Sequence, residues 1–84
     1  MNPRTIAQAA KVAIEVLTLA SRAAQTPFDW LQINQMTCHL LAALNEIEQA
    51  EYLDRQLRQE ARETAQFLRN IQHQSCSKVE NAKS

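Results

Sequence analysis

The 84-residue chain contains no glycine, and this absence restricts its fold more than any other feature of its composition. Glycine supplies the positive backbone φ that tight hairpin turns need, and it forms the loops that cradle phosphate groups in nucleotide-binding motifs. The sequence therefore argues against a fold of many β-hairpins, and against Rossmann, P-loop and kinase-type sites. It predicts an all-α protein with very few turns.

An excess of charge of one sign is also missing, because nine Lys and Arg balance nine Asp and Glu. This balance argues against binding to nucleic acid or to a membrane through bulk electrostatics. Lys11, Glu15 and Arg22 interrupt the apolar N-terminal stretch, which is typical of neither a signal peptide nor a transmembrane helix. Two cysteines, Cys38 and Cys76, make no disulfide framework. We expect a cytoplasmic chain with reduced thiols and no membrane association.

The two prolines are each placed to begin a helix. Pro3 follows Asn2 and Pro27 follows Thr26, so each proline stands at the first helical position after a residue that can cap the helix. An acid three residues after Thr26 completes a pattern that resembles a capping box. We predict a first helix over about 3–24 and a short connection, which makes the next helix antiparallel to it.

After Pro27, the chain up to about Gln72 contains neither proline nor glycine, and apolar residues recur through it at alternating spacings of three and four. This repeat is typical of a coiled coil and exceeds the usual minimum of about three to four heptads. We predict one continuous helix over 27–72, followed by a disordered polar tail over 73–84. The repeat consists of Ile33, Met36, Leu40, Ala43, Ile47, Ala50, Asp54, Leu57, Ala61, Thr64, Leu68 and Ile71.

A break near Asn45 is the alternative, because Asn45 is followed by acids, as at the start of a helix. On a straight helix, the apolar face also turns by about 120° between the two halves of this span. Supercoiling at about 20° per heptad explains only part of that turn. The remainder indicates a bend, a break or different partners for the two halves.

The first helix is apolar around most of its circumference, which indicates burial on more than one side. A neighbouring helix covers one apolar seam, so the other must meet a second chain or a third helix of the same chain. We favour an antiparallel helical hairpin whose long second helix pairs into a dimeric helical bundle; the alternative is a three-helix bundle with a break near Asn45. The first seam is Ile6, Ala10, Ala13, Leu17, Ala20 and Ala24, and the second seam is Ala9, Val12, Val16, Leu19 and Ala23.

Residues from both helices are candidates for a partner-binding or dimer seam. They are Val12, Val16, Leu19, Leu53, Leu57, Leu68 and Ile71. Four arginines at spacings of three, four and seven form a stripe that is either a solvated face or a grip for acidic protein surfaces or phosphates. They are Arg55, Arg58, Arg62 and Arg69. Trp30, with Phe28, either plugs the end of the hairpin or anchors a partner.

Residues suited to catalysis or metal binding are few. Cys38 and His39 are neighbours on a helix and point in different directions, while His73 and Cys76 lie near the C-terminus. We expect no enzyme, no metal site and no cofactor.

The predicted function is therefore a non-enzymatic protein–protein interaction module that acts through apolar helix faces. It would be a homodimeric adaptor, chaperone or inhibitor, for example a phage- or plasmid-type inhibitor of a host protein, and we expect a second protein as its partner. The alternative is a small helical nucleic-acid-binding regulator that uses the arginine stripe.

Overall fold

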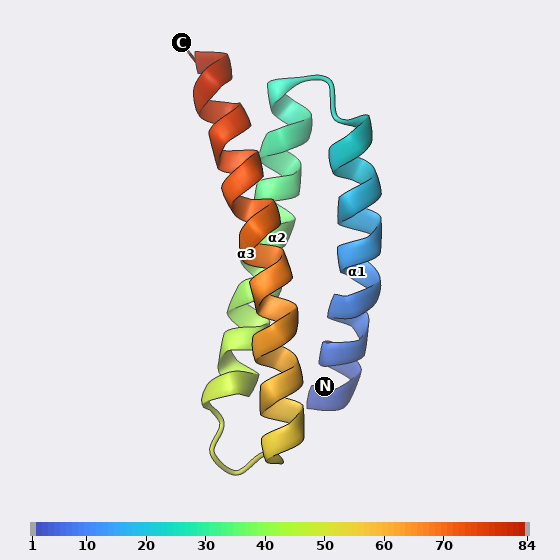
Figure 1. The fold of residues 1–84 in the computed structure, drawn as a ribbon, viewed down its shortest axis with the longest axis vertical. Helices are drawn as coiled ribbons and strands as arrows, with labels where there is room; N and C mark the ends of the chain where they lie inside the picture. Colours follow the sequence, from blue (N-terminus) through green and yellow to red (C-terminus); the bar gives the residue numbers. More distant parts are fainter. Residues whose placement is uncertain (1, 84) are drawn as a thin grey trace.

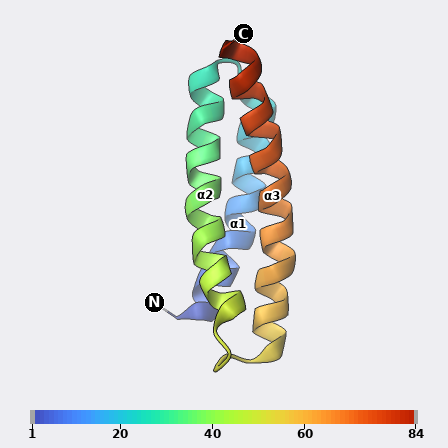
Figure 2. The same ribbon diagram turned by 90° about the vertical axis from the view of Figure 1, so that its left-hand side faces the viewer.

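A computed structural model describes residues 2–83 of the chain, and side chains for residues 2–80. The described part forms three helices in the order α1 (Pro3–Ala23), α2 (Pro27–Gln49) and α3 (Arg55–Lys83) (Figure 1). Successive helices run in opposite directions, and α1 packs against both α2 and α3 (Figure 2). The bundle measures about 45 × 20 × 18 Å. The all-α prediction is confirmed.

Both proline-marked helix starts are confirmed, with the predicted caps. The side-chain oxygen of Asn2 accepts a hydrogen bond from the backbone N–H of Arg4 at 2.9 Å. At α2, the Thr26 hydroxyl accepts from the N–H of Asp29 at 3.2 Å, and the Asp29 carboxylate accepts from the N–H of Thr26 at 3.2 Å. This reciprocal pair is a capping box, which supplies partners for amides that the first turn leaves unpaired.

The predicted continuous helix over 27–72 is wrong, because α2 ends at Gln49 and a connection over 50–54 leads into α3. Ala50 has extended backbone angles, and its carbonyl accepts from the N–H of Leu53 at 3.0 Å in a tight turn. The break therefore lies a little beyond Asn45, which is inside α2. The three-helix arrangement, held as the alternative, is the one observed.

Asp54 explains where the break falls. Its side-chain oxygen accepts from the N–H of Gln56 at 3.0 Å, and its carbonyl accepts from the N–H of Arg58 at 3.0 Å. These two bonds make Asp54 the residue that caps the start of α3. The heptad pattern placed Asp54 on an apolar face, where it was one of two polar exceptions, whereas in the fold it begins a new helix.

The predicted disordered tail over 73–84 is also wrong for the residues that the structure describes, because α3 continues to Lys83. Ser75 is fully buried, and its hydroxyl lies 3.1 Å from the side-chain oxygen of Asn34 on α2. Val79, one turn further on, packs against the core. The contact of Ser75 with α2 and the packing of Val79 hold the polar end of α3 against the bundle without a periodic apolar face. Ser84 lies outside the described residues.

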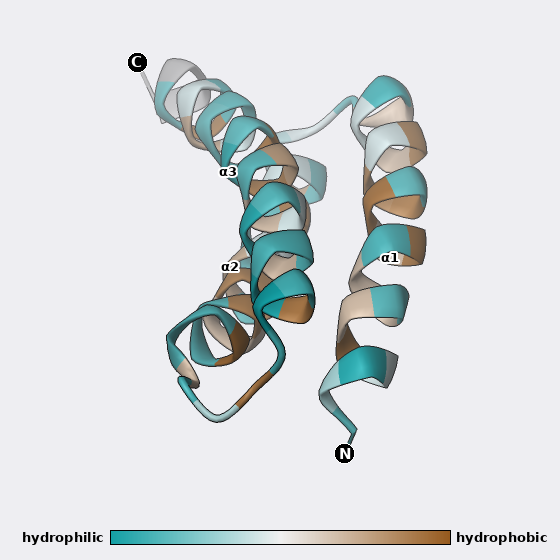
Figure 3. Ribbon diagram, turned by 60° about the horizontal axis from the view of Figure 1, so that its bottom comes forward, coloured by the Kyte–Doolittle hydropathy of each residue, from teal (hydrophilic) through white to brown (hydrophobic). Residues whose placement is uncertain are grey.

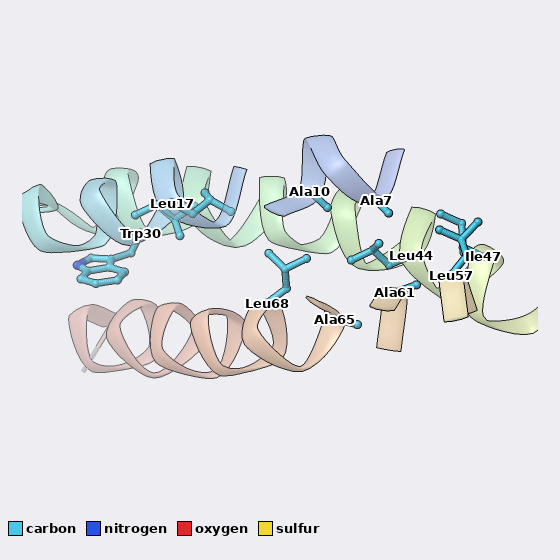
Figure 4. Close-up of a cluster of buried hydrophobic side chains, with 11 residues drawn as sticks. Ala7, Ala10, Leu17, Trp30, Leu44, Ile47, Leu57, Ala61, Ala65 and Leu68 are labelled. Atoms are coloured by element: carbon cyan, nitrogen blue, oxygen red, sulfur yellow. The ribbon is translucent and has the colours of Figure 1, made fainter. Parts of the chain in front are cut away.

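The core runs along the axis of the bundle and is built mostly between α2 and α3 (Figure 4). Leu17, Leu44 and Leu68, one from each helix, are its fully buried leucines. Buried alanines on α1 and α3 let the helix backbones approach closely. The whole set is Ala7, Ala10, Leu17, Trp30, Ile33, Leu44, Ile47, Leu57, Ala61, Ala65 and Leu68.

Two further buried hydroxyls find partners within their own helices. Thr37 donates to the carbonyl of Ile33 at 2.6 Å, and Thr64 donates to the carbonyl of Glu60 at 2.8 Å. A buried polar group without a partner costs folding free energy, whereas these groups are satisfied locally. Among the described side chains, none has a buried nitrogen or oxygen without a hydrogen bond.

Candidate interaction surface

The second seam of α1 lies on the surface of the bundle. Val12 is 61% exposed, Val16 55% and Leu19 64%, while the first seam points inward, with Ala10 and Leu17 fully buried. Figure 3 shows hydrophobic residues of α1 on the side facing α2 and α3 and also on the outer side. Soluble proteins seldom leave a row of large aliphatic side chains open to water, so this row is the leading candidate for a binding surface.

A shallow groove between α1 and α2 extends this surface. Its walls include Val16 and Ala20 of α1 and Gln32 and Met36 of α2, and its volume is about 160 Å³. Met36 is 51% exposed, although the heptad pattern placed it on the inward face of the helix. Met36 lines the groove beside α1, but α1 leaves about half of its side chain exposed to solvent. The second seam and Met36 together form what we call the α1/α2 apolar face.

The other large exposed side chains are more scattered. Phe28, at the start of α2, is 64% exposed, and Phe67 of α3 is 61% exposed. Phe67 lines a hollow of about 310 Å³ between α1 and α3, whose other walls carry Lys11, Glu15 and Glu60. Lys11 and Glu60 form an ion pair across this hollow at 3.9 Å. Charged side chains thus surround Phe67, whereas none interrupts the second seam. Phe67 was not among the predicted seam residues; it lies between Gln66 and the buried Leu68, and its side chain points into this hollow.

The other half of the predicted dimer seam belongs to the core of the single chain. Leu57 and Leu68 are buried between the helices, and Leu53 and Ile71 pack against the same core. Their assignment to a partner-binding face is therefore wrong. That assignment placed these residues on the second half of one continuous helix, whereas the break folds α3 back along α2, so that they face the core of the single chain.

Trp30 is buried in the core at the end of the bundle near the α1–α2 connection, and Figure 4 shows it close to Leu17. It therefore acts as the plug rather than as an exposed anchor. Phe28 does not share this role, because its side chain is largely in solvent. The capping box holds the first turn of α2 in helical register, and this register points Trp30 inward.

Three of the four arginines in the stripe lie around one hollow beside Glu48. Arg55, Arg58 and Arg62 line a hollow of about 300 Å³ together with Glu48 of α2. The Nε of Arg58 donates to the backbone carbonyl of Glu48 at 3.0 Å, and the Nε of Arg62 lies 3.9 Å from the Glu48 carboxylate. A cation is favourable at the negative end of a helix, and the last turn of α2 has no basic residue of its own. Arg58 and Arg62 therefore join α3 to α2.

The cysteines lie at the α2–α3 boundary and are both exposed free thiols. Gln72 lies 3.0 Å from the Cys38 sulfur, and the Cys76 thiol lies 3.3 Å from the side-chain oxygen of Asn34. In the described part of the chain, no three side chains of His, Cys, Asp or Glu come close enough to hold a metal ion. Neither His39 nor His73 has a described hydrogen bond through its side chain.

The described helices include no segment that combines the length and the apolar character needed to cross a membrane. The fold and the surface define a three-helix bundle whose α1/α2 apolar face is open to solvent. Comparison of the chain with protein-family models, with curated proteins and with solved structures finds no match.

Proposed function

We propose that the chain is a non-enzymatic protein–protein interaction module that binds through the α1/α2 apolar face. The observation that carries this proposal is the exposure of Val12, Val16 and Leu19 on a bundle whose core is already complete without them. Burying such side chains against a partner removes apolar surface from water, which is the main favourable term in protein association. An adaptor, a chaperone and an inhibitor would each work in this way.

The arginine stripe gives less support to a nucleic-acid-binding regulator. Arg58 and Arg62 contact Glu48, and the carboxylate within the arginine hollow would repel a phosphate group. Arg69 is exposed but does not line that hollow.

The test places a photo-reactive benzoylphenylalanine at Val16 in the cells that produce the chain. The same probe at Gln66, an exposed position on α3, is the matched control. We expect covalent adducts with protein, either a second copy or another polypeptide, from position 16 and not from position 66. Absence of any protein adduct at position 16 would contradict the proposed function.

A further inference from the structure

We propose that the α1/α2 apolar face is covered by a second copy of the chain, with the two α1 helices packed antiparallel about a two-fold axis. This inference rests on the proposed function, since it names the occupant of the same surface. A two-fold homodimer buries the same patch on both subunits, so the patch must be complementary to itself. Two properties of α1 meet this requirement.

The first property is the order of side-chain sizes along the second seam. From residue 9 to residue 23, the seam has an alanine at each end and three larger side chains, Val12, Val16 and Leu19, between them. The reverse order is the same. When one α1 is laid antiparallel on another, with Val16 opposite Leu19 of the second copy, aliphatic side chains meet in the middle. The alanines lie toward both ends and allow the helices to approach closely.

The second property is the charge along the rim of the seam. Glu15 lies on the side of α1 that faces the α3 hollow, away from α2, and Arg22 follows one heptad later on the same side. Both are exposed, and among the described residues neither forms an ion pair within the chain. In the antiparallel arrangement, Glu15 of each copy comes within side-chain reach of Arg22 of the other. The two-fold axis thus produces two equivalent ion pairs, each between Glu15 of one copy and Arg22 of the other.

Other arrangements of the same two helices lack this match. A parallel pair places Glu15 near Ala20 of the second copy, which carries no charge and faces the α1/α2 groove. An antiparallel pair shifted by one heptad, with Val16 opposite Val12, brings the two Glu15 carboxylates toward each other. The opposite rim of the seam carries Ala13 and Ala20, which are small enough to leave room for α2 of each copy. Charge complementarity therefore selects one orientation and one register.

The test measures the dissociation constant of the dimer by sedimentation equilibrium across the micromolar range. The α1/α2 apolar face offers four large exposed apolar side chains, Val12, Val16, Leu19 and Met36, whereas a standard interface involves about 20–30 residues a side, so we expect a micromolar constant rather than a tighter one. Glu15→Arg and Arg22→Glu, made singly, each replace two attractive contacts by two repulsive ones. Each is expected to raise the constant on the order of tenfold, an effect that shrinks at high salt. The double variant restores both pairs with the charges exchanged and should return the constant to that of the unmodified chain.

Val16→Asp places a charge in the centre of the face and should abolish the dimer while leaving the helical circular dichroism of the chain unchanged. Tyr52→Asp is the matched control, because it places the same charge at an exposed apolar residue, but in the connection over 50–54, and should leave the dimer intact. Dimerisation that Tyr52→Asp abolishes and Val16→Asp does not would overturn the assignment of the face. Failure of the double variant to recover affinity would overturn the antiparallel register.

The outcomes also separate this inference from the proposed function. If the purified chain stays monomeric throughout and the probe at Val16 links to a different protein, the second copy is wrong and the interaction module stands. If the chain stays monomeric and the probe links to no protein, both are wrong.

Discussion

Individual leucines of the bundle differ widely in how much of the fold depends on them. Leu44 of α2 is fully buried between α1 and α3, whereas Leu31 of the same helix is 41% exposed. Truncating a buried leucine loses transfer free energy and leaves a cavity, so Leu44→Ala should lower the free energy of unfolding by about 2–5 kcal/mol. Leu31→Ala should change it by less than about 0.5 kcal/mol. Urea titration followed by circular dichroism measures both, and equal losses would contradict the placement of Leu44.

Asp29 gives the stability of the bundle a dependence on pH. The backbone N–H groups of Gln25 and Thr26, together with the Thr26 side chain, stabilise the charged carboxylate and lower the pKa of Asp29 below its ordinary value of 3.8. A group with a lowered folded-state pKa stabilises the fold fully above the unfolded-state value. That stabilisation is lost as the pH falls through the folded-state pKa.

The variant Asp29→Asn isolates this contribution, because asparagine keeps an acceptor oxygen but does not titrate. The thermal midpoint of the unmodified chain should exceed that of Asp29→Asn near neutral pH, and the two should converge as the pH falls below about 4. A constant difference down to pH 2 would show that the Asp29 charge does not contribute to the cap.

At the scale of the helices, the start of α3 depends on one side chain. Asp54 accepts from the N–H of Gln56, and the first turn of α3 contains no acid that could replace it. Asp54→Ala should therefore cost about 0.5–2 kcal/mol of stability. Asn45→Ala is the matched control, since Asn45 is exposed inside α2, where alanine is the better helix former. Chemical denaturation measures the free energy of unfolding of both variants. A larger loss for Asn45→Ala than for Asp54→Ala would contradict Asp54 as the residue that begins α3.

The three helices should also differ in local stability. α2 and α3 contact each other along most of their length, whereas α1 packs against them through fewer and smaller side chains, including Ala7 and Ala10. Regions with few buried contacts open more readily than the rest of a fold. In the Val16→Asp variant, where no second copy protects α1, backbone amides of α1 should exchange with deuterium faster than central amides of α2 and α3. Equal protection in all three helices would contradict this ranking.

Local features of this fold could be read from the sequence, and features that depend on how helices pack could not. The starts of α1 and α2 are visible because proline and a capping side chain act within one turn. The connection over 50–54 contains neither proline nor glycine, and the apolar repeat continues on both sides of Asp54, which therefore read as a polar exception within one helix. Two sequence features indicated a break: the acids after Asn45, which lie inside α2, and the 120° turn of the apolar face, which gave no exact position for it. The exposed half of the candidate surface, Val12, Val16 and Leu19, follows from the helical periodicity of α1. The role of Leu57 and Leu68 depended on where the chain turns back.

For the whole molecule, the size of the single chain separates the two architectures. The folded bundle has a radius of gyration of 13.7 Å over its Cα atoms and a longest extent of 45 Å. A continuous helix over 27–72 would alone be about 69 Å long at 1.5 Å per residue. Small-angle X-ray scattering of the Val16→Asp variant should therefore give a compact particle with a longest dimension well below that length. A particle as long as the continuous helix would contradict the turn at 50–54.

The lack of glycine is matched by a backbone in which no described residue has a positive φ. Every described position therefore has a conformation that L-amino acids other than proline adopt without strain. Substitution is then limited by side-chain volume and polarity, and not by the backbone. In a saturation scan, the surface positions should tolerate most replacements, and even the two connections should accept bulky residues. Many sequences with few residues in common can thus encode this bundle, provided that they keep its burial pattern and its helix caps.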